Sequence, residues 1–180
     1  MKKTIGILIA VVVLVALIVV AVFVINNNKK TPSNLNINNV EELTALVDKI
    51  YEGVTIEMPM LQTMPVDMAD VDAVKSFTGL DSAENLEYVV YSEPMMSSIA
   101  YSLVLVKVKD GANVDSIAKA MNDNVDARKW ICVTAEKVYS TSSGDIACLV
   151  MSNESLAKNV FSSFKTQAGT VGTEYERAGE

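Results

Sequence analysis

The feature that most constrains this chain is an unbroken apolar run, Ile5 to Ile25, that contains no charged or polar side chain. As a helix rising ~1.5 Å per residue, its 21 residues reach about 31 Å, close to the ~30 Å hydrocarbon core of a bilayer. Lipid offers the backbone no hydrogen-bond partners, so the run is expected to be helical despite its many Val and Ile residues. The sequence therefore predicts a transmembrane helix and a membrane-attached chain.

The residues around this run favour an uncleaved signal-anchor. Signal peptides have apolar regions of ~7–15 residues that end in a small-x-small cleavage site. The run here is longer, and its end, Ala21 to Asn26, has no such site. A lipoprotein would need a cysteine directly after the run, whereas the first cysteine is Cys132.

Charge predicts the topology. One lysine pair precedes the run at 2–3 and a second follows it at 29–30, so the amino terminus gives a small positive-inside excess to the N-terminal side. All 22 acidic residues lie after the run, and the 11 basic residues beyond Lys30 leave that part with a net charge of −11. We expect a single-pass protein of the cell membrane, with its N-terminus inside and its folded domain extracytoplasmic.

Composition removes several classes of function. The chain has no histidine, which rules out His-based zinc sites, Ser-His-Asp and Cys-His catalytic machinery and the usual near-neutral proton shuttle. The acidic balance argues against nucleic acid or an anionic surface as a partner. We predict no cofactor and no nucleic-acid partner.

Length and composition predict one domain of ordinary size after the anchor. The expected organisation is a cytoplasmic N-terminus at 1–4, a transmembrane helix at 5–25, a flexible stalk at 26–38, an extracytoplasmic α+β domain at 39–169 and a tail at 170–180.

Within the domain, hydrophobic periodicity predicts a strand-strand-helix unit that occurs twice. Expected elements are a helix from Asn39 to Gly53, a short helix at 69–77, strands at 86–92 and 99–109, a helix after Asn113, strands at 131–139 and 146–151, and a helix from Ser152 or Asn153 to Gly169. This order predicts an antiparallel sheet with helices on one face, preceded by one or two helices.

The two cysteines fall on opposite arms of the second predicted hairpin, which turns near 142–144. Around that turn Cys148 would pair with residue 137, so Cys132 lies five positions out of register. Two buried free thiols are therefore favoured, and a disulfide would require an irregular loop.

Two segments carry the predicted partner surface. Met95 and Met96 lie in the loop between the first two strands, where adjacent methionines either form an adhesive surface or tuck under the sheet. Arg128, Lys129 and Trp130 lie at the start of a strand, where a cation pair beside the only Trp could grip an anionic group or a protein. The plainer interpretation, which we favour, is a buried Trp with Arg and Lys solvated beside it.

Two other clusters are assigned to packing and to solvent. The four methionines from Met58 to Met68 are soft Cu(I) ligands, but methionine more often fills gaps where a loop crosses a core. The aspartates at 67, 70, 72, 123 and 126 lack EF-hand spacing and are expected on an acidic surface.

The stretches Ser92–Val106, Arg128–Val133, Ala135–Val138 and Ser143–Asp145 resemble an uncharacterised family of membrane-anchored extracytoplasmic proteins of Gram-positive anaerobic bacteria. The resemblance covers less than half of the chain. It implies a bacterial cell-surface setting and brings with it no known activity and no residue role.

These observations favour a membrane-tethered, non-catalytic extracytoplasmic domain that binds a protein or another envelope partner. One alternative is a self-assembling subunit of a membrane-associated complex, a homo-oligomer joined through a free sheet edge. The other is a His-independent hydrolase, which would need two carboxylates that converge in a concave pocket.

Overall fold

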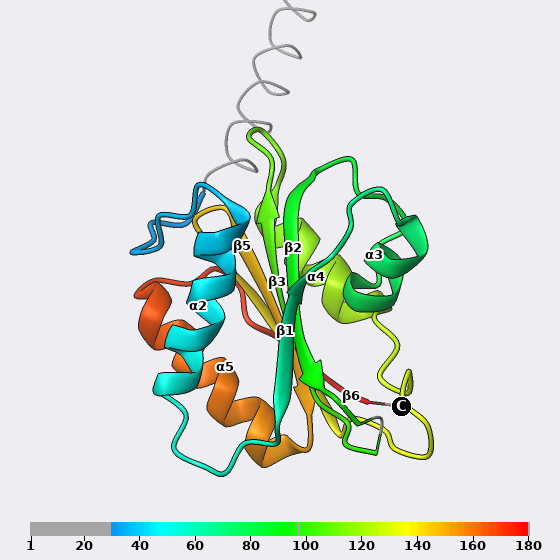
Figure 1. Ribbon diagram of the computed structural model, residues 1–180. Helices are drawn as coiled ribbons and strands as arrows, with labels where there is room; N and C mark the ends of the chain where they lie inside the picture. Colours follow the sequence, from blue (N-terminus) through cyan, green and yellow to red (C-terminus); the bar gives the residue numbers. More distant parts are fainter. Residues whose placement is uncertain (1–29, 97, 180) are drawn as a thin grey trace, which may run out of the picture.

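An antiparallel sheet of six strands forms the centre of the computed structural model, which describes residues 30–96 and 98–179 (Figure 1). In chain order the elements are α2 (Val40–Glu52), β1 (Leu61–Pro65), α3 (Val71–Thr78), β2 (Leu86–Pro94), β3 (Ser102–Val108), α4 (Val114–Asn124), β4 (Lys137–Ser143), β5 (Ile146–Ser152), α5 (Glu154–Ala168) and β6 (Tyr175–Ala178). The strands lie in the order β1-β2-β3-β5-β4-β6. The predicted α+β class and antiparallel sheet are confirmed.

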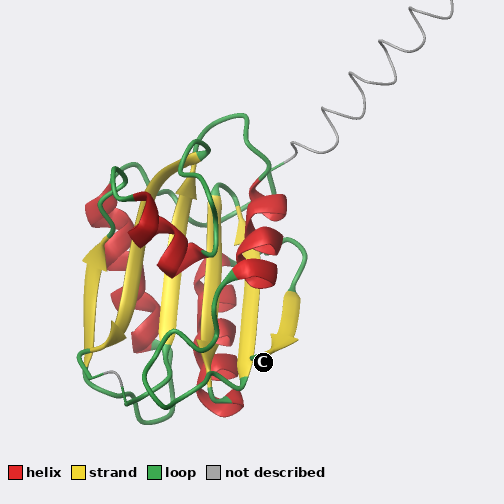
Figure 2. Ribbon diagram, turned by 90° about the vertical axis from the view of Figure 1, so that its right-hand side faces the viewer, coloured by secondary structure: helices red, strands yellow, loops and turns green. Residues whose placement is uncertain are grey.

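Helices cover both faces of the sheet, so the prediction of helices on one face is wrong (Figures 1 and 2). α2 and α5 pack on one face, and α3 and α4 pack on the other. The reason lies in the two central strands. All seven residues of β5 and all but Lys107 of β3 are buried. Strands that are apolar on both faces need a cover on both faces.

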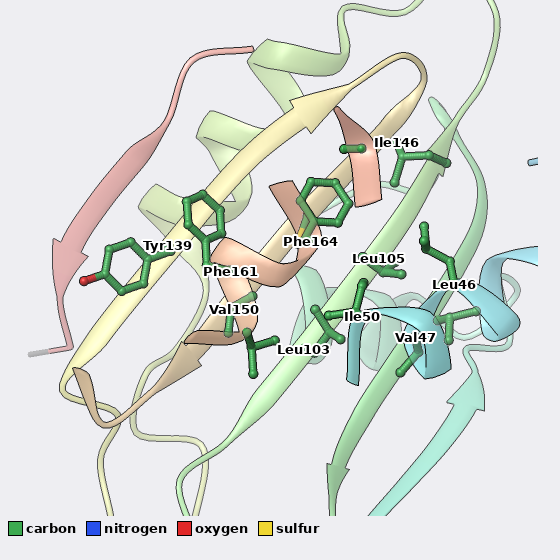
Figure 3. Close-up of a cluster of buried hydrophobic side chains, with 14 of the residues drawn as sticks. Leu46, Val47, Ile50, Leu103, Leu105, Tyr139, Ile146, Val150, Phe161 and Phe164 are labelled. Carbon is green, nitrogen blue, oxygen red and sulfur yellow. The ribbon is translucent and has the colours of Figure 1, made fainter. Parts of the chain in front are cut away.

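The core under α2 and α5 is the larger of the two (Figure 3). Side chains from both helices meet the β3, β4 and β5 residues that point to this face, and Tyr139 stacks on Phe161 with ring centroids 5.4 Å apart. The labelled members of this core are Leu46, Val47, Ile50, Leu103, Leu105, Tyr139, Ile146, Val150, Phe161 and Phe164. The final helix is therefore core, as its apolar periodicity predicted.

Asparagine side chains start three of the four helices in the described part of the chain. The side chains of Asn39, Asn113 and Asn153 each accept a hydrogen bond from the backbone N–H three residues further on. Such N-caps satisfy one of the donors that a helix leaves free at its start. The predicted starts at Asn39 and Asn113 are confirmed, and Asn153 rather than Ser152 starts α5.

The second hairpin is displaced from its predicted position. β4 begins at Lys137 rather than at residue 131, and Ser143 pairs with Ile146 around a two-residue turn. Gly144 in that turn has φ +60°, a conformation that favours glycine. Residues 131–136, which were predicted to be part of the strand, consequently belong to a loop that spans 125–136.

Two short strands lie where the sequence predicts none. β1 falls in the methionine- and proline-rich segment, and β6 falls in the predicted tail. Both are edge strands, pairing with β2 and β4 respectively. The folded domain therefore continues beyond residue 169, and its C-terminal boundary lies further along the chain than predicted.

The segment 30–38, predicted as the end of a flexible stalk, lies along the domain. Ile37 is buried and Leu35 is half-buried against the core under α2 and α5. The predicted transmembrane helix and its flanking lysines at 2–3 and 29 lie outside the described residues. Among the helices that are described, none is long and apolar enough to cross a membrane.

Candidate partner-binding surface

One end of the sheet carries most of the exposed large apolar side chains. In the described part of the chain these are Met60, Met64, Val71, Met95, Met96, Ile99 and Ile131. Five of them, Met60, Met95, Met96, Ile99 and Ile131, lie just before β1, in the β2–β3 loop and in the loop after α4; we call these five the methionine end. The three segments lie at the lower end of the sheet in Figure 1, opposite the end at which the described chain begins.

The strand register brings two of these methionines together. Leu61 pairs with Pro94, so the same register continued by one residue places Met60 opposite Met95. The two side chains are 80% and 66% exposed. Further along β1, Met64 pairs with Tyr91 on the same face of the sheet. Two apolar pairs therefore lie on this face of β1 and β2, separated by the polar pair of Gln62 and Glu93.

An ion pair at this end of the sheet joins β2 to the loop after α4. The Lys129 ammonium contacts a Glu93 carboxylate oxygen, and the two side chains are only 11% and 18% exposed. Neither of these two atoms has a hydrogen-bond partner besides the other. Burial lowers the pKa of Lys129, while the nearby Glu93 carboxylate opposes that shift. The pair fixes the loop that carries Ile131 against the end of β2.

Aromatic rings surround the buried ammonium group. Lys129 Nζ lies 4.7 Å from the centroid of the Phe77 ring and 5.4 Å from that of the Trp130 ring. Phe77 in turn stacks on Tyr91 with centroids 3.9 Å apart. Cation–π contacts of this kind stabilise a cation that has been taken out of water. The loop is thus held by α3, β2 and its own Trp.

The other face of the sheet supports the same end through a pair of tyrosines. Tyr101, just before β3, is fully buried, and its hydroxyl donates to the Tyr51 hydroxyl at 2.9 Å. Burial raises the pKa of Tyr51 to about 12 and raises that of Tyr101 well above its ordinary value. A buried, hydrogen-bonded tyrosine pair therefore lies at the same end of the sheet as the methionine end, on the opposite face.

The structure places the predicted partner-surface residues at one end of the sheet, but it exposes some of them and buries others. Met95 and Met96 are both exposed, so they do not tuck under the sheet. Arg128 is exposed, as expected for a solvated cation. Lys129 is buried in the ion pair, contrary to the interpretation that solvated it, and Trp130 is half-buried.

The methionines from Met58 to Met68 do not share a site. Met58 packs against the core under α2 and α5, whereas Met68 packs against the core on the opposite face. Met60 and Met64 are exposed, so the prediction that these methionines fill gaps in a core is wrong for these two. Since the first and last thioethers lie on different sides of the sheet, the cluster has no common centre for a soft metal ion.

The acidic residues considered for catalysis are exposed and serve local structure. Asp70 caps α3, Asp67 accepts from the Ala69 N–H and Asp126 accepts from the Arg128 N–H. The described residues contain no group of three or more His, Cys, Asp or Glu side chains that could hold a metal ion.

Both cysteines are free thiols, but only one is buried. Cys148 lies in β5, where burial raises its pKa well above the ordinary value. Cys132 is exposed in the loop after α4 and has a positive φ of 64°. The prediction of two free thiols is confirmed. The prediction that both are buried is wrong, because residues 131–136 lie in a loop outside the sheet.

Sequence reasoning missed the residues that support this surface: Phe77, Tyr91 and Glu93. A signal was present in the alternation of β2, where Tyr91, Glu93 and Met95 share one face. Nothing in the sequence linked Glu93 to Lys129, because 35 residues and a whole helix separate them.

No family model, curated protein or solved structure matches this chain. The resemblance to membrane-anchored proteins of Gram-positive anaerobes therefore stays a prediction.

Proposed function

We propose that this chain is a membrane-tethered, non-catalytic extracytoplasmic domain that binds a protein partner through the methionine end. Residues 5–25 would anchor it as an uncleaved signal-anchor in the cell membrane, with the N-terminus inside. The proposal rests on one observation above all. Most of the exposed large apolar side chains of the described residues gather at one end of the sheet, where a buried ion pair joins β2 to the loop that carries Ile131.

The chemistry of this surface suits a protein partner. Scattered exposed apolar residues are ordinary, but gathered ones mark interaction sites. Methionine side chains are flexible and polarizable, so they adapt to irregular apolar partners. The Glu93–Lys129 pair is internally neutral and contributes no net charge to the surface. The net charge of −11 beyond Lys30 would favour a partner with a positive rim.

The self-assembly alternative has less support at the β1 edge. Val66 N–H donates to the Val89 carbonyl, which makes the even-numbered residues of β1 the ones bonded to β2. The backbone groups of Leu61, Thr63 and Pro65 therefore point away from β2, and Pro65 has no N–H. Only two outward donors remain along β1, which is a poor template for a second sheet.

The hydrolase alternative has less support, because neither of the two grooves described on the α2–α5 face brings two carboxylates together. Two grooves lie on the α2–α5 face, with volumes of about 400 and 210 Å³. Glu42 is the only carboxylate that lines the first groove, and the second groove has none. Glycoside hydrolysis by paired carboxylates needs one such group on each side of the scissile bond.

Site-specific photo-crosslinking in intact native cells tests the proposal. A benzophenone amino acid replaces Met96, or Lys158 on the exposed side of α5 as the matched control. We expect one discrete adduct from position 96, identified by mass spectrometry as an envelope protein, and none from position 158. The adduct should disappear when Ile131→Asp is added. Equal adducts from both positions, or an adduct that Ile131→Asp leaves unchanged, would contradict the proposal.

Topology is tested separately by protease shaving of cells whose wall has been removed. Protease should digest the domain beyond Asn26 without breaking the membrane. Protection of the domain until the membrane is opened would reverse the proposed orientation.

A further inference from the structure

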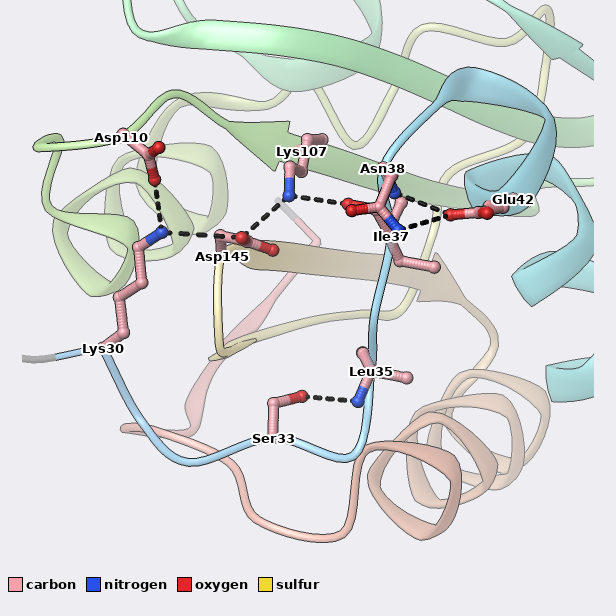
Figure 4. Close-up of polar contacts among 9 residues, drawn as sticks. All are labelled: Lys30, Ser33, Leu35, Ile37, Asn38, Glu42, Lys107, Asp110 and Asp145. Atoms are coloured by element: carbon pink, nitrogen blue, oxygen red, sulfur yellow. Dashed lines mark hydrogen bonds and ion pairs between the residues drawn. The ribbon is translucent and has the colours of Figure 1, made fainter.

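A charged network ties the start of the described chain to the end of the sheet opposite the methionine end (Figure 4). Lys30 Nζ bonds to Asp110 at 2.8 Å and lies 3.5 Å from Asp145 in the β4–β5 turn. Asp145 also accepts from Lys107 at 2.8 Å. Lys107 in turn donates to the backbone carbonyl of Ile37 at 2.7 Å. Both ends of the segment 30–38 are therefore attached to the same end of the sheet.

Backbone bonds fix the middle of this segment. The Gly144 N–H donates to the Thr31 carbonyl at 3.1 Å, and the Asn34 N–H donates to the Ala168 carbonyl at 3.0 Å. The fit is close, since a Cβ at Gly144 would lie 2.9 Å from the Ser33 Cβ. With Ile37 buried as well, the segment 30–38 is a docked part of the domain and not a free tether.

The two ends of the sheet are separated by the length of β2. This strand runs from Leu86, beside the Lys30 network, to Pro94, beside the methionine end. Its nine residues rise about 27 Å, and the loop beyond Pro94 adds to that distance. By contrast, the five peptide steps from Ile25 to Lys30 span at most about 18 Å when fully extended.

We infer that the docked segment 30–38 keeps the methionine end turned away from the membrane, so that this surface binds an apolar segment of a protein rather than lipid. The inference rests on the proposed function, because it takes residues 5–25 as the anchor. The available tether is too short to bring the methionine end to the bilayer while the domain stands upright.

Only a domain lying on its side would place the methionine end at the lipid surface. That position would press a domain with a net charge of −11 against the bilayer. Anionic lipids repel such a surface within about a Debye length, ~8–10 Å. If the segment 30–38 undocked, its nine residues would add up to about 30 Å of tether and remove the restriction.

Depth-dependent fluorescence quenching tests the inference on the full chain in vesicles of phosphatidylcholine and phosphatidylglycerol. The exposed Cys132, next to Ile131, is labelled directly, because Cys148 is buried. The second probe is Asn85→Cys in a Cys132→Ser background, an exposed position at the Lys30 end of β2. With quenchers on the lipid headgroups, we expect loss of fluorescence at position 85 and none at position 132. Quenching at position 132 equal to that at position 85 would overturn the inference.

A matched pair of variants tests the role of the docked segment. Asp145→Asn combined with Ile37→Asp removes both the carboxylate shared by Lys30 and Lys107 and the buried apolar side chain of the segment. This double variant should release the segment and allow quenching at position 132 to rise. Asp110→Asn, at a fully exposed side chain, should leave position 132 unquenched. No rise with the double variant would show that something other than this segment sets the orientation.

Vesicle flotation separates this inference from the function on which it rests. A chain that does not float with the vesicles has no membrane anchor, and the proposed tether fails together with the inference. A chain that floats and shows quenching at position 132 keeps its anchor, and only the protein-facing orientation is lost. A chain that floats with position 132 unquenched supports both.

Discussion

The two ends of the sheet use charge in opposite ways. At the Lys30 end, ion pairs lie near the surface and attach a segment of chain to the domain: Asp110 is 98% exposed and Asp145 is 26% exposed. At the methionine end, the Glu93–Lys129 pair is largely buried and joins the end of β2 to the loop after α4. The Lys30 end binds a segment of the same chain, whereas the methionine end exposes an apolar surface.

This difference has an energetic consequence. Exposed ion pairs contribute ~0–1 kcal/mol, because water and salt screen them and long side chains lose entropy. A buried pair is different, since removing one partner leaves an uncompensated charge away from water. Substitutions at the methionine end should therefore affect stability more than similar substitutions at the Lys30 end.

The largest effect is expected in the core that both ends share. Phe164 is a fully buried residue of α5, so Phe164→Ala should lower the free energy of unfolding by ~3–5 kcal/mol. That is a large part of the ~5–15 kcal/mol that holds a domain together. Urea-unfolding midpoints measure the change.

Lys158→Ala is the control on the exposed side of the same helix and should change stability by less than about 0.5 kcal/mol. Hydrogen exchange on Phe164→Ala should show faster opening at both ends of the sheet. Faster exchange at only one end would mean that the two ends unfold independently, as separate units.

The second prediction breaks the buried pair at the methionine end. Glu93→Gln should destabilise the domain by about 3 kcal/mol, because the Lys129 ammonium stays buried without its counter-charge. Adding Lys129→Met to Glu93→Gln removes that charge and should recover most of the loss. Thermal and urea unfolding of the single and double variants give the coupling between the two residues. A double variant that is less stable than Glu93→Gln alone would refute the idea of an isolated charge pair.

The parts of the fold that local pattern determines could be predicted from the sequence. The two strand-strand-helix units, the helix starts at Asn39 and Asn113 and the apolar face of α5 follow from periodicity and capping, which act within a few residues. The placement of helices on both faces could have been inferred as well, since Ile146–Ser152 is apolar at nearly every position.

What the sequence could not show depends on contacts between distant residues. β1 and β6 have little strand character of their own, because edge strands take their order from the neighbour to which they bond. Met95 and Met96 were candidates for a partner surface from the sequence, but the exposure of Met60 and the Glu93–Lys129 pair were not predicted. Likewise, the segment 30–38 reads as a polar stalk until its partners Lys107 and Asp145 are known.

The third prediction concerns the tyrosine pair behind the methionine end. The folded domain keeps the Tyr51 proton up to a pKa of about 12, whereas the unfolded chain loses it near 10. Stability from this group is therefore fully present below pH 10 and is lost as the pH rises through 12. The loss should amount to about 2–3 kcal/mol, at 1.36 kcal/mol for each pKa unit.

Tyr51→Phe should flatten this alkaline decline while lowering stability at neutral pH, since the Tyr101 hydroxyl loses its acceptor. The shape of the stability curve between pH 9 and 12, and not its height, is the measurement that matters. Curves of equal slope for the two proteins would show that the alkaline decline arises elsewhere in the domain.

The smallest effects are expected at the Lys30 end, where two aspartates can be compared directly. Asp145 receives the half-buried Lys107 and also approaches Lys30, so Asp145→Asn should lower stability by about 1 kcal/mol. Asp110 is fully exposed and bonds only to Lys30, so Asp110→Asn should leave the unfolding midpoint unchanged. Salt sharpens the contrast, because screening acts mainly on exposed charges. Unfolding midpoints at 0.05 M and 1 M salt should show a smaller difference between Asp145→Asn and the parent protein at high salt, without removing it. If Asp110→Asn proved as harmful as Asp145→Asn, the attachment of the segment 30–38 would depend on the surface charge of Lys30 and not on the half-buried bridge through Lys107. The Lys30 end would then no longer differ from an ordinary charged surface.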